Sequence, residues 1–297
     1  MLAIEPQAGP APVVQVISHA QRSVDLNVYE MTSKAVERAL RQVCQRGVRV
    51  RVMIETKPYR AHRLVNKEER ALGGSCVHWK SAPARFERRY VFDHAKYVVA
   101  DAGTAHASAE LGTANFTWSA FHRNREYLWT THRHAVTHSL ATIFEADWHR
   151  KRAGNGPRQH LVVSPGAAPA VLRLVNQSGP VEIEAEELGS AHRVMHALEH
   201  KGRQVELILP KRLTHYERKR ARALKQAGVQ IRLISSPYMH AKMIVGEHRA
   251  FIGSQNFSHS SLYKNREVGV VLGAKADLAR LHKQFEADWR KAHDEQK

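Results

Sequence analysis

The sequence predicts an α/β fold made of two similar halves, each a mixed, mostly parallel sheet flanked by helices. Three observations support this prediction: a set of segments that recurs in the same order, an alternation of strand-like and helix-like apolar patterns, and enough apolar residues for packed cores. The chain has 297 residues, of which 43% are hydrophobic, and this length accommodates two modest domains.

The second half of the chain repeats the first at a period of roughly 150 residues, which is the size of a domain and too long for a solenoid unit. The repeat begins with the segment 24–33, which aligns with 181–190 apolar for apolar and places Glu30 opposite Glu187. The other matches, in order, are 46–52 with 201–207, 81–83 with 235–237, His94-Ala-Lys96 with His240-Ala-Lys242, Asn115-Phe116 with Asn256-Phe257, Asn124-Arg-Glu126 with Asn265-Arg-Glu267, and Phe144-Glu-Ala-Asp-Trp148 with the identical Phe285-Glu-Ala-Asp-Trp289. We interpret the series as a gene duplication, with one half at 1–155, the other at 156–297, and a Gly- and Pro-rich linker between Ala153 and Pro169.

Each half contains the pattern of a βαβ unit. In the first half, apolar residues alternate over 24–28 as in a strand, and then recur at helical spacing from Ser33 until Gly47, which ends the predicted helix. A second alternation over 48–54 predicts the next strand, and such a unit favours a largely parallel sheet covered by helices. The repeated Phe-Glu-Ala-Asp-Trp segment closes each half, and we expect it on a terminal helix whose Phe and Trp pack inward.

The composition predicts a polyanionic partner. Forty-six Lys and Arg residues against 28 Asp and Glu give a formal net charge of +18, and nucleic acid is the first candidate. An anionic lipid surface and a merely solubilising surface are the alternatives. No apolar run approaches the roughly 20 residues of a membrane-spanning helix, and the first twelve residues lack the pattern of a signal peptide. We expect no transmembrane segment, and the compartment stays open between the cytoplasm and a secreted or periplasmic location with the leader absent from this numbering.

Cysteine and histidine patterns give no indication of a metal site. Cys44 and Cys76 are the only cysteines, too few for a disulfide framework or a zinc site, and we expect Cys44 to be a buried thiol on a helical apolar face. His134 and His138 have the helical spacing of a metal site, but without a third ligand a solvated helix face is the favoured interpretation.

The chemistry is expected at the repeated His-x-Lys pairs. Apolar residues separate His94-Ala-Lys96 from Asp101 and predict a buried strand, and alternate side chains of a strand share a face. A single such pair is more often a solvated strand edge than a catalytic pair. Here the pair recurs as His240 and Lys242, each time followed by Gly-Thr/Ser-x-Asn-Phe, and this recurrence predicts a functional site.

These residues resemble the phospholipase D superfamily, which is defined by two His-Lys-Asp motifs, and the resemblance covers nearly the whole chain. It implies two sheets packed about a pseudo-twofold axis, with both motifs facing one cleft. It also implies a metal-independent phosphodiesterase that reacts through a covalent phosphohistidine, without cofactor or metal. Because both motifs lie in one chain, we expect a monomer that is an internal pseudo-dimer.

The residue types agree with that mechanism. A neutral imidazole attacks phosphorus, and an imidazolium across the cleft protonates the departing alkoxide. The usual order in the family assigns His94 as nucleophile and His240 as general acid, although the pseudo-symmetry permits the reverse. The two motif lysines, with Asn115 and Asn256, would donate hydrogen bonds to the non-bridging oxygens.

Carboxylates of both halves are candidate catalytic residues. Glu126 and Glu267 resemble the family carboxylates that accept a hydrogen bond from the far nitrogen of each His, and the alternative is surface pairing with Arg125 and Arg266. 

Two further pairs of positions complete the predicted site. Asp101 ends the first motif, whereas Glu247 stands in its place in the second, where the longer side chain puts the role of this position in doubt. Thr113 and Ser254 either contact the substrate or shape the turn.

The substrate prediction depends on a loop inserted before the first motif. Its Arg85, Arg88 and Arg89, with Phe86 and Tyr90, suit single-stranded nucleic acid, in which phosphates pair with guanidinium groups and bases stack on rings. The alternative is a loop that only packs its aromatic residues. A basic helical face within 211–225 is a second candidate, with a solvated face as its alternative.

These features favour a sequence-nonspecific nuclease on DNA or RNA. A phospholipase D that hydrolyses or transphosphatidylates phospholipids is the alternative in the same mechanistic class. A catalytically idle nucleic-acid-binding module is the alternative from a different class.

Overall fold

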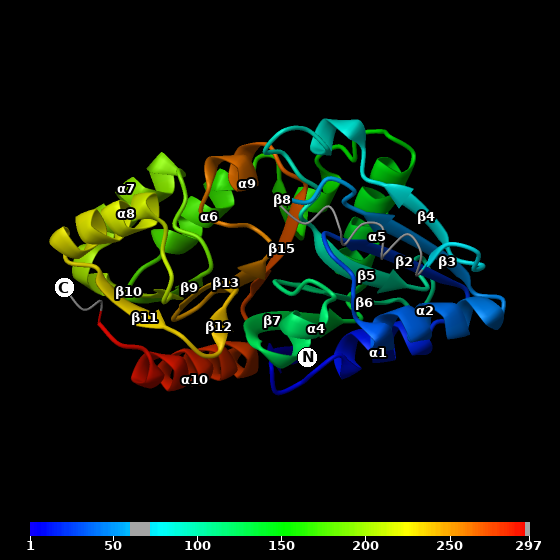
Figure 1. The fold of residues 1–297 in the computed structure, drawn as a ribbon, viewed down its shortest axis with the longest axis horizontal. Coiled ribbons are helices and arrows are strands. Elements are labelled where there is room, and N and C mark those ends of the chain that lie inside the picture. The colour runs from blue at the N-terminus through cyan, green and yellow to red at the C-terminus, as the bar shows by residue number, and fades with distance from the viewer. Residues whose placement is uncertain (60–71, 295–297) are drawn as a thin grey trace.

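The structure is a computed structural model, which describes residues 1–59 and 72–294. Two sheets lie side by side, one from each half of the chain (Figure 1). The first half contains β1 (Leu2–Glu5), α1 (Ala11–Ser18), β2 (Ser23–Val28), α2 (Lys34–Gln45), β3 (Arg49–Ile54), β4 (His78–Ser81), η1 (Ala84–Phe86), β5 (Lys96–Ala100), β6 (Ser108–Gly112), α4 (Trp118–His122), β7 (Asn124–Thr131) and α5 (His134–Trp148). The second half contains η2 (Gly156–Gln159), β8 (Val162–Ser164), α6 (Ala168–Val175), β9 (Val181–Ala185), α7 (His192–Lys201), η3 (Gly202–Gln204), β10 (Val205–Pro210), α8 (His215–Gln226), β11 (Gln230–Ile234), β12 (Tyr238–Met239), β13 (Lys242–Gly246), β14 (Ala250–Gly253), α9 (His259–Tyr263), β15 (Glu267–Leu272) and α10 (Lys275–Lys291).

The two sheets have matching topologies. The first has the order β1-β7-β6-β5-β2-β3-β4 and the second β11-β10-β9-β13-β14-β15-β8, and β12 of the second half pairs with β7 of the first. These matching mixed sheets confirm the predicted α/β class with two similar halves. Parallel pairing along these paths is confined to β2–β3–β4 and β9–β10–β11, so the parallel share is smaller than predicted. The short connections after β5 and β13 can join only antiparallel neighbours.

Three apolar clusters hold the described elements together. One lies between the first sheet and α1 and α2, and a second lies between the second sheet and α6, α7 and α8. The third joins both sheets through α5 and α10. The repeated Phe-Glu-Ala-Asp-Trp segments lie on these two helices, as predicted: Phe144, Trp148 and Phe285 are buried, and Trp289 packs against the same cluster.

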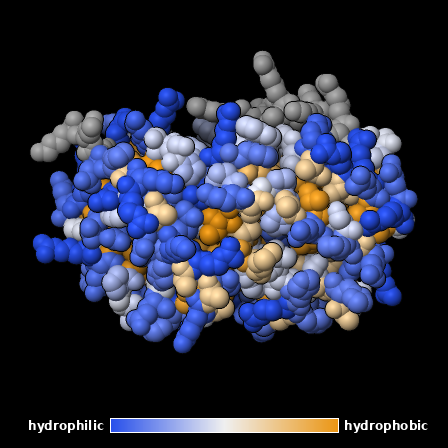
Figure 2. Space-filling view, turned by 90° about the horizontal axis from the view of Figure 1, so that it is seen from below, coloured by the Kyte–Doolittle hydropathy of each residue, from blue (hydrophilic) through white to orange (hydrophobic). Residues whose placement is uncertain are grey.

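The surface is largely polar on the face seen in Figure 2, where apolar side chains are scattered among hydrophilic ones. Within residues 1–59 and 72–294, no helix is both long and apolar enough to cross a membrane.

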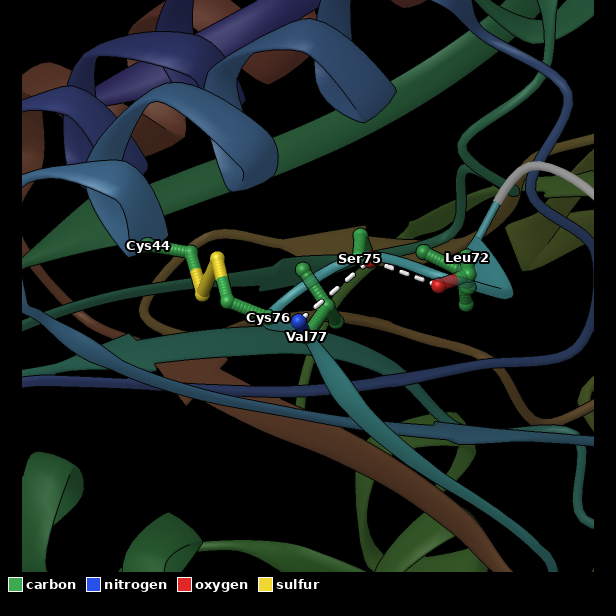
Figure 3. The surroundings of a disulfide bond; sticks show 5 residues. All are labelled: Cys44, Leu72, Ser75, Cys76 and Val77. Carbon is green, nitrogen blue, oxygen red and sulfur yellow. Dashed lines mark hydrogen bonds between the residues drawn. A yellow bond between two sulfur atoms is a disulfide. The ribbon is translucent and has the colours of Figure 1, made fainter.

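Cys44 and Cys76 form a disulfide, which corrects the expectation of a free buried thiol (Figure 3). Cys44 lies in the last turn of α2, and Cys76 lies in the segment that leads into β4. Ser75 Oγ donates a hydrogen bond to the Leu72 carbonyl at 2.6 Å and accepts one from Val77 N at 3.3 Å, which fixes the turn around Cys76. The two cysteines are 32 positions apart, so their proximity depends on the packing of α2 against β3 and β4.

The predicted linker is also part of a sheet. β8 pairs with the edge of the second sheet through β15, just as β1 pairs with β7, and Gln255 Nε2 donates a hydrogen bond to the Val162 carbonyl at 2.9 Å. The three-residue strand is too short to show an alternating pattern. The division of the chain at 155 and 156 stays a prediction.

Candidate active site

The two motifs meet where the halves join. β5 begins at Lys96 and β13 at Lys242, so each motif His lies two residues before a central strand. The backbone before each His pairs with the opposite half: His94 N donates to the Arg266 carbonyl at 2.8 Å, and Tyr238 N donates to the Arg123 carbonyl at 3.1 Å. These crossed backbone bonds hold both motifs at a single junction, near β7 and β12 in Figure 1.

His94 is held as a neutral imidazole with a free lone pair. Its Nδ1 lies 3.0 Å from Glu267 Oε2 and 3.2 Å from the Ser254 carbonyl oxygen. Both neighbours are acceptors, so Nδ1 bears the proton and Nε2 is left with the lone pair. Burial, with the nearby charges of Lys96 and Lys242, holds the pKa of His94 well below its usual value.

His240 has different surroundings. Its Nδ1 lies 2.7 Å from Glu126 Oε1, and its Nε2 lies 3.4 Å from Glu186 Oε2. Both nitrogens can donate at once only in the imidazolium form. Lys242 Nζ is 3.3 Å from the same Nδ1, but the shorter contact with Glu126 determines the hydrogen bond. The pseudo-symmetric motifs therefore place their two histidines in different environments.

Glu126 and Glu267 are fixed by donors of their own halves. Thr113 Oγ1 donates to Glu126 Oε2 at 2.6 Å, and Asn265 Nδ2 donates to Glu267 Oε1 at 3.0 Å. Ser261 Oγ also donates to Glu267 Oε1. Both carboxylates are fully buried, and each contacts the His of the opposite half.

The alternative of surface pairing with the adjacent arginines is not observed. Arg125 forms a buried pair with Asp288, and Arg266 with Asp147. These two aspartates belong to the repeated terminal segments, which the sequence had suggested only as sources of packed aromatic residues.

Each motif lysine donates a hydrogen bond to the main-chain carbonyl of the motif His two positions before it. Lys96 Nζ donates to the His94 carbonyl at 2.7 Å and lies 5.2 Å from the centre of the Tyr29 ring. Burial lowers the pKa of Lys96 to about 7, and the charge of Lys242 adds to this effect while Glu267 opposes it. Lys242 Nζ donates to the His240 carbonyl and to Glu186 Oε2, each at 2.6 Å.

Asn115 and Asn256 match in that the side-chain oxygen of each is buried without a hydrogen-bond partner among the described residues. A buried amide without a partner is costly, and its oxygen and nitrogen can exchange places by rotation. These side chains are therefore available to bind a group that enters the junction.

The two turn hydroxyls make hydrogen bonds that shape their own halves, and their contact with substrate stays a prediction. Thr113 Oγ1 accepts a hydrogen bond from Tyr127 N at 2.9 Å while donating to Glu126. Ser254 Oγ accepts one from Val268 N at 3.0 Å. Both hydroxyls are buried and bonded within their own half.

Asp101 and Glu247 lie away from the histidines, contrary to their predicted place in the site. Asp101 follows the far end of β5, and its carboxylate accepts hydrogen bonds from Gln21 N, Arg22 N and Ser23 N at 2.9, 2.7 and 3.0 Å. It therefore fixes the start of β2. Glu247 is exposed after β13, with 71% of its side chain accessible. Each lysine begins a five-residue strand and the acidic residue follows its other end, which explains why neither carboxylate reaches the junction.

Two further residues at the junction, Glu186 and Tyr29, were not predicted from the sequence, and they occupy equivalent positions of the repeat. Tyr29 packs its ring edge-on against His94, with 4.8 Å between centroids. Glu186 contacts both His240 and Lys242. Burial alone would raise the pKa of Glu186, but the charges of His240 and Lys242 lower it to about 2. The alignment of 24–33 with 181–190 contained the indication, because a tyrosine there stands opposite an acid.

The inserted loop divides its arginines between two roles. Arg85 Nη2 bonds to Asp147 Oδ1 and to the Lys151 carbonyl at 2.5 and 2.6 Å, so this side chain holds the loop against α5. Arg88 and Arg89 are exposed, and Arg89 lies over the Tyr90 ring at 5.1 Å.

Two homologous mixed sheets, with a His-x-Lys motif from each half at one junction, define the class of two-motif phospholipase D folds. The chain belongs to the phospholipase D-like family: the family model described as "Cardiolipin synthase, PLD-like domain" matches residues 13–148 and 189–289. This match confirms the resemblance found in the sequence. A search of curated proteins finds no match.

Solved structures show the same fold. Polyphosphate kinase from Porphyromonas gingivalis superposes with a TM-score of 0.73 at 16% identity, over 100% of this chain and 52% of that one. Phosphatidylserine synthase from Haemophilus influenzae Rd KW20 gives 0.70 at 12% identity, over 98% and 87% of the two chains. The chain thus spans about half the length of the polyphosphate kinase and most of the length of the synthase.

Proposed function

We propose that the chain is a metal-independent phosphodiesterase that acts through a phosphohistidine on His94, with DNA or RNA as substrate. The observation that supports this is the crossed pairing of each motif His with a carboxylate of the opposite half. It gives one junction a neutral imidazole, a second imidazole placed between two carboxylates, and two lysines.

In the first step, His94 Nε2 attacks phosphorus and the bond to the leaving oxygen breaks. His240, as imidazolium, gives its Nε2 proton to that oxygen, so the alcohol leaves neutral. The Nδ1–H of His94 stays bonded to Glu267, which stabilises the positive charge that forms on the ring.

In the second step, water enters and the roles of acid and base reverse. His240 Nε2 accepts a proton from the water as its oxygen bonds to phosphorus, and the bond to His94 Nε2 breaks. The products are a phosphate monoester and the original protonation state of both rings. Lys96, Lys242, Asn115 and Asn256 would donate to the non-bridging oxygens in both steps.

The charge of the chain favours nucleic acid as the substrate. The net charge of +18 attracts a polyanion, and exposed Arg88 and Arg89 stand beside an exposed tyrosine, Tyr90. Guanidinium groups and rings together suit phosphates and bases of a single strand.

Phospholipid is the second candidate substrate, supported by the description of the matching family model and by the fold shared with a phosphatidylserine synthase. Its chemistry would use the same two histidines. The residues around the junction, and not the two histidines, therefore determine which of the two substrates binds.

The first experiment compares substrates in the presence of a chelator. Purified protein in EDTA is assayed on single- and double-stranded DNA, on RNA and on phosphatidylcholine vesicles. Cleavage of nucleic acid is expected. Release of choline with intact nucleic acid would replace the nuclease assignment by a phospholipase, and a folded protein that cleaves none of these substrates would contradict the proposed function.

A second experiment separates the two histidines. With bis(p-nitrophenyl) phosphate, the leaving group departs without protonation, so His240→Ala should release a burst of p-nitrophenolate and accumulate an acid-labile adduct on His94. His94→Ala should show neither. The reverse result would assign the nucleophile to His240.

A further inference from the structure

A basic pocket lies beside the junction, lined by several separate segments of the chain. Its volume is about 760 Å³, and its basic residues come from the loop 85–91, the connection between the halves at 152–158, and the end of α9 with the residues after it, while Ile143, Val163 and Pro165 add apolar wall. We propose that this basic pocket binds the phosphate backbone of a single-stranded nucleic acid whose scissile phosphate lies at His94. The proposal rests on the proposed function and assigns it a second contact region for the substrate.

Most of the positive charge of the pocket has no counter-charge among the described residues. Seven of its lining residues are Arg or Lys, and none of those that the structure describes is acidic. Arg85 and Arg266 share a single carboxylate, that of Asp147. Within residues 1–59 and 72–294, no ion pair involves the other five cations, which are Arg88, Arg89, Arg152, Arg158 and Lys264. A polyanion would supply the missing counter-charge.

The guanidinium groups of the pocket are also close enough to affect one another. Burial lowers the pKa of Arg158, and the charge of Arg266 adds to the effect. The pKa of Arg85 is likewise lowered by burial and by Arg266, although Asp147 opposes the shift. Bound phosphates would relieve this repulsion.

An exposed ring completes the pocket. Tyr263 lines the wall and stacks on His259, with centroids 4.9 Å apart and planes at 25°. A base could extend this stack, because every base has a ring face. Arginines with a stacking ring are the combination that binds single strands without sequence preference.

The basic pocket and the catalytic junction share Arg266. Arg266, which lines the pocket, accepts the backbone hydrogen bond of His94 through its carbonyl. Six positions of chain separate Arg88 from His94, a reach of at most roughly 20 Å. A strand held at His94 can therefore place its neighbouring phosphates in the pocket.

The concave shape favours a strand over a bilayer. A membrane surface is flat on this scale, so its headgroups would meet only the exposed rim, whereas a flexible single strand can follow the walls. A lipid surface is therefore an outcome of the test and not the proposal.

The test removes two exposed cations of the pocket that make no ion pair. Arg152→Ala/Lys264→Ala is made in full-length protein with His94→Ala to prevent cleavage, and its affinity for a labelled oligothymidylate is measured by anisotropy at several salt concentrations. Each lost phosphate contact lowers the slope of log K against log salt by about 0.7 for a single strand, so we expect a slope smaller by about 1.4. Affinity for a dinucleotide, which is too short to reach the pocket, should fall much less.

A matched variant controls for general electrostatics. Arg280→Ala/Lys283→Ala removes two exposed cations from α10 in the second half, and we expect the slope to stay at the parent value. An unchanged slope in Arg152→Ala/Lys264→Ala, with a native circular dichroism spectrum, overturns the proposal. Loss of binding to phosphatidylglycerol vesicles with unaltered oligonucleotide binding overturns it as well, in favour of lipid.

The failure of the pocket and the failure of the proposed function are distinguishable. If the wild-type protein cleaves oligonucleotides but the pocket variant keeps its salt slope, only the pocket assignment is wrong. If the slope falls as expected but no nucleic acid is cleaved in chelator, the pocket assignment is supported and the nuclease assignment is wrong.

Discussion

Glu186 is the residue that most clearly distinguishes the two motifs. Its carboxylate lies between His240 Nε2 and Lys242 Nζ, at 3.4 and 2.6 Å, where a substrate oxygen would otherwise bind. With a pKa of about 2 it is charged at neutral pH. A phosphodiester is also an anion, so it must compete with this carboxylate for the same two partners.

Replacing Glu186 by Gln should therefore tighten substrate binding. We expect Glu186→Gln to lower KM for bis(p-nitrophenyl) phosphate, and Ki for inorganic phosphate, by about tenfold, which corresponds to about 1.4 kcal/mol. Glu187→Gln, assayed below pH 7, is the matched control, because burial and the neighbouring Glu186 raise the pKa of Glu187 to about 7, so below that pH the substitution removes little charge. A higher KM in Glu186→Gln would show that Glu186 helps to bind the substrate.

Lys96 should determine the alkaline side of the pH profile. Its pKa is lowered to about 7, so its positive charge is present below that pH and is lost as the pH rises through it. If the charge stabilises the transition state, kcat/KM falls above about pH 7, whereas the low pKa of His94 keeps the nucleophile available well below pH 6.5. In Lys96→Arg the arginine stays charged above pH 7. The residual kcat/KM should therefore no longer fall on the alkaline side of the profile. If kcat/KM of Lys96→Arg still falls above about pH 7, a group other than Lys96 causes the fall.

At the scale of single residues, the site residues that occur in both halves were predictable from the sequence, and a residue that differs between the halves was not. His94, Lys96 and their second copies were evident because the motif occurs twice in the same context. Glu186 was missed because it breaks the repeat. Asp101 was assigned to the site because spacing along a strand gives no distance from the junction.

At the scale of elements, the disulfide is the feature with the largest expected effect on stability. It ties the end of α2 to the segment before β4 across 32 positions. Closing a loop of this length restricts the unfolded chain and contributes about 3–4 kcal/mol in the chain-entropy model.

Cys76→Ser should lower the free energy of unfolding by about that amount, measured by urea denaturation. Wild-type protein in dithiothreitol is the matched control and should unfold at the same urea concentration as the variant. Equal stability of oxidised and reduced wild type would mean that the bond adds nothing to the packing around α2.

The βαβ units and terminal helices were predictable because their apolar patterns are long and regular. β8 and β12 were not, since strands of three and two residues are too short for a period. Their positions depend instead on partners from distant segments, β15 and β7.

At the scale of the whole molecule, two buried ion pairs cross between the halves with pseudo-twofold symmetry. Arg125 of the first half donates from Nε and Nη2 to Asp288 of the second, at 2.6 and 3.0 Å. Arg266 of the second donates in the same way to Asp147 of the first, at 2.7 and 3.0 Å. Each arginine directly precedes the glutamate that contacts the motif His of the opposite half, so the same strands that join the halves also orient the histidines.

Removing one partner of a crossed pair should weaken folding and catalysis together. Asp288→Ala leaves the Arg125 guanidinium buried without its carboxylate, which is expected to cost about 3–5 kcal/mol of the free energy of unfolding. Arg125→Ala/Asp288→Ala leaves no uncompensated charge and should recover part of the loss, so a double-mutant cycle by urea denaturation gives the coupling. Because the third apolar cluster is shared by both halves, each variant should unfold in a single transition. Two separate transitions, with Asp288→Ala shifting only one of them, would show instead that the halves fold independently and that the junction is not part of a common cooperative unit.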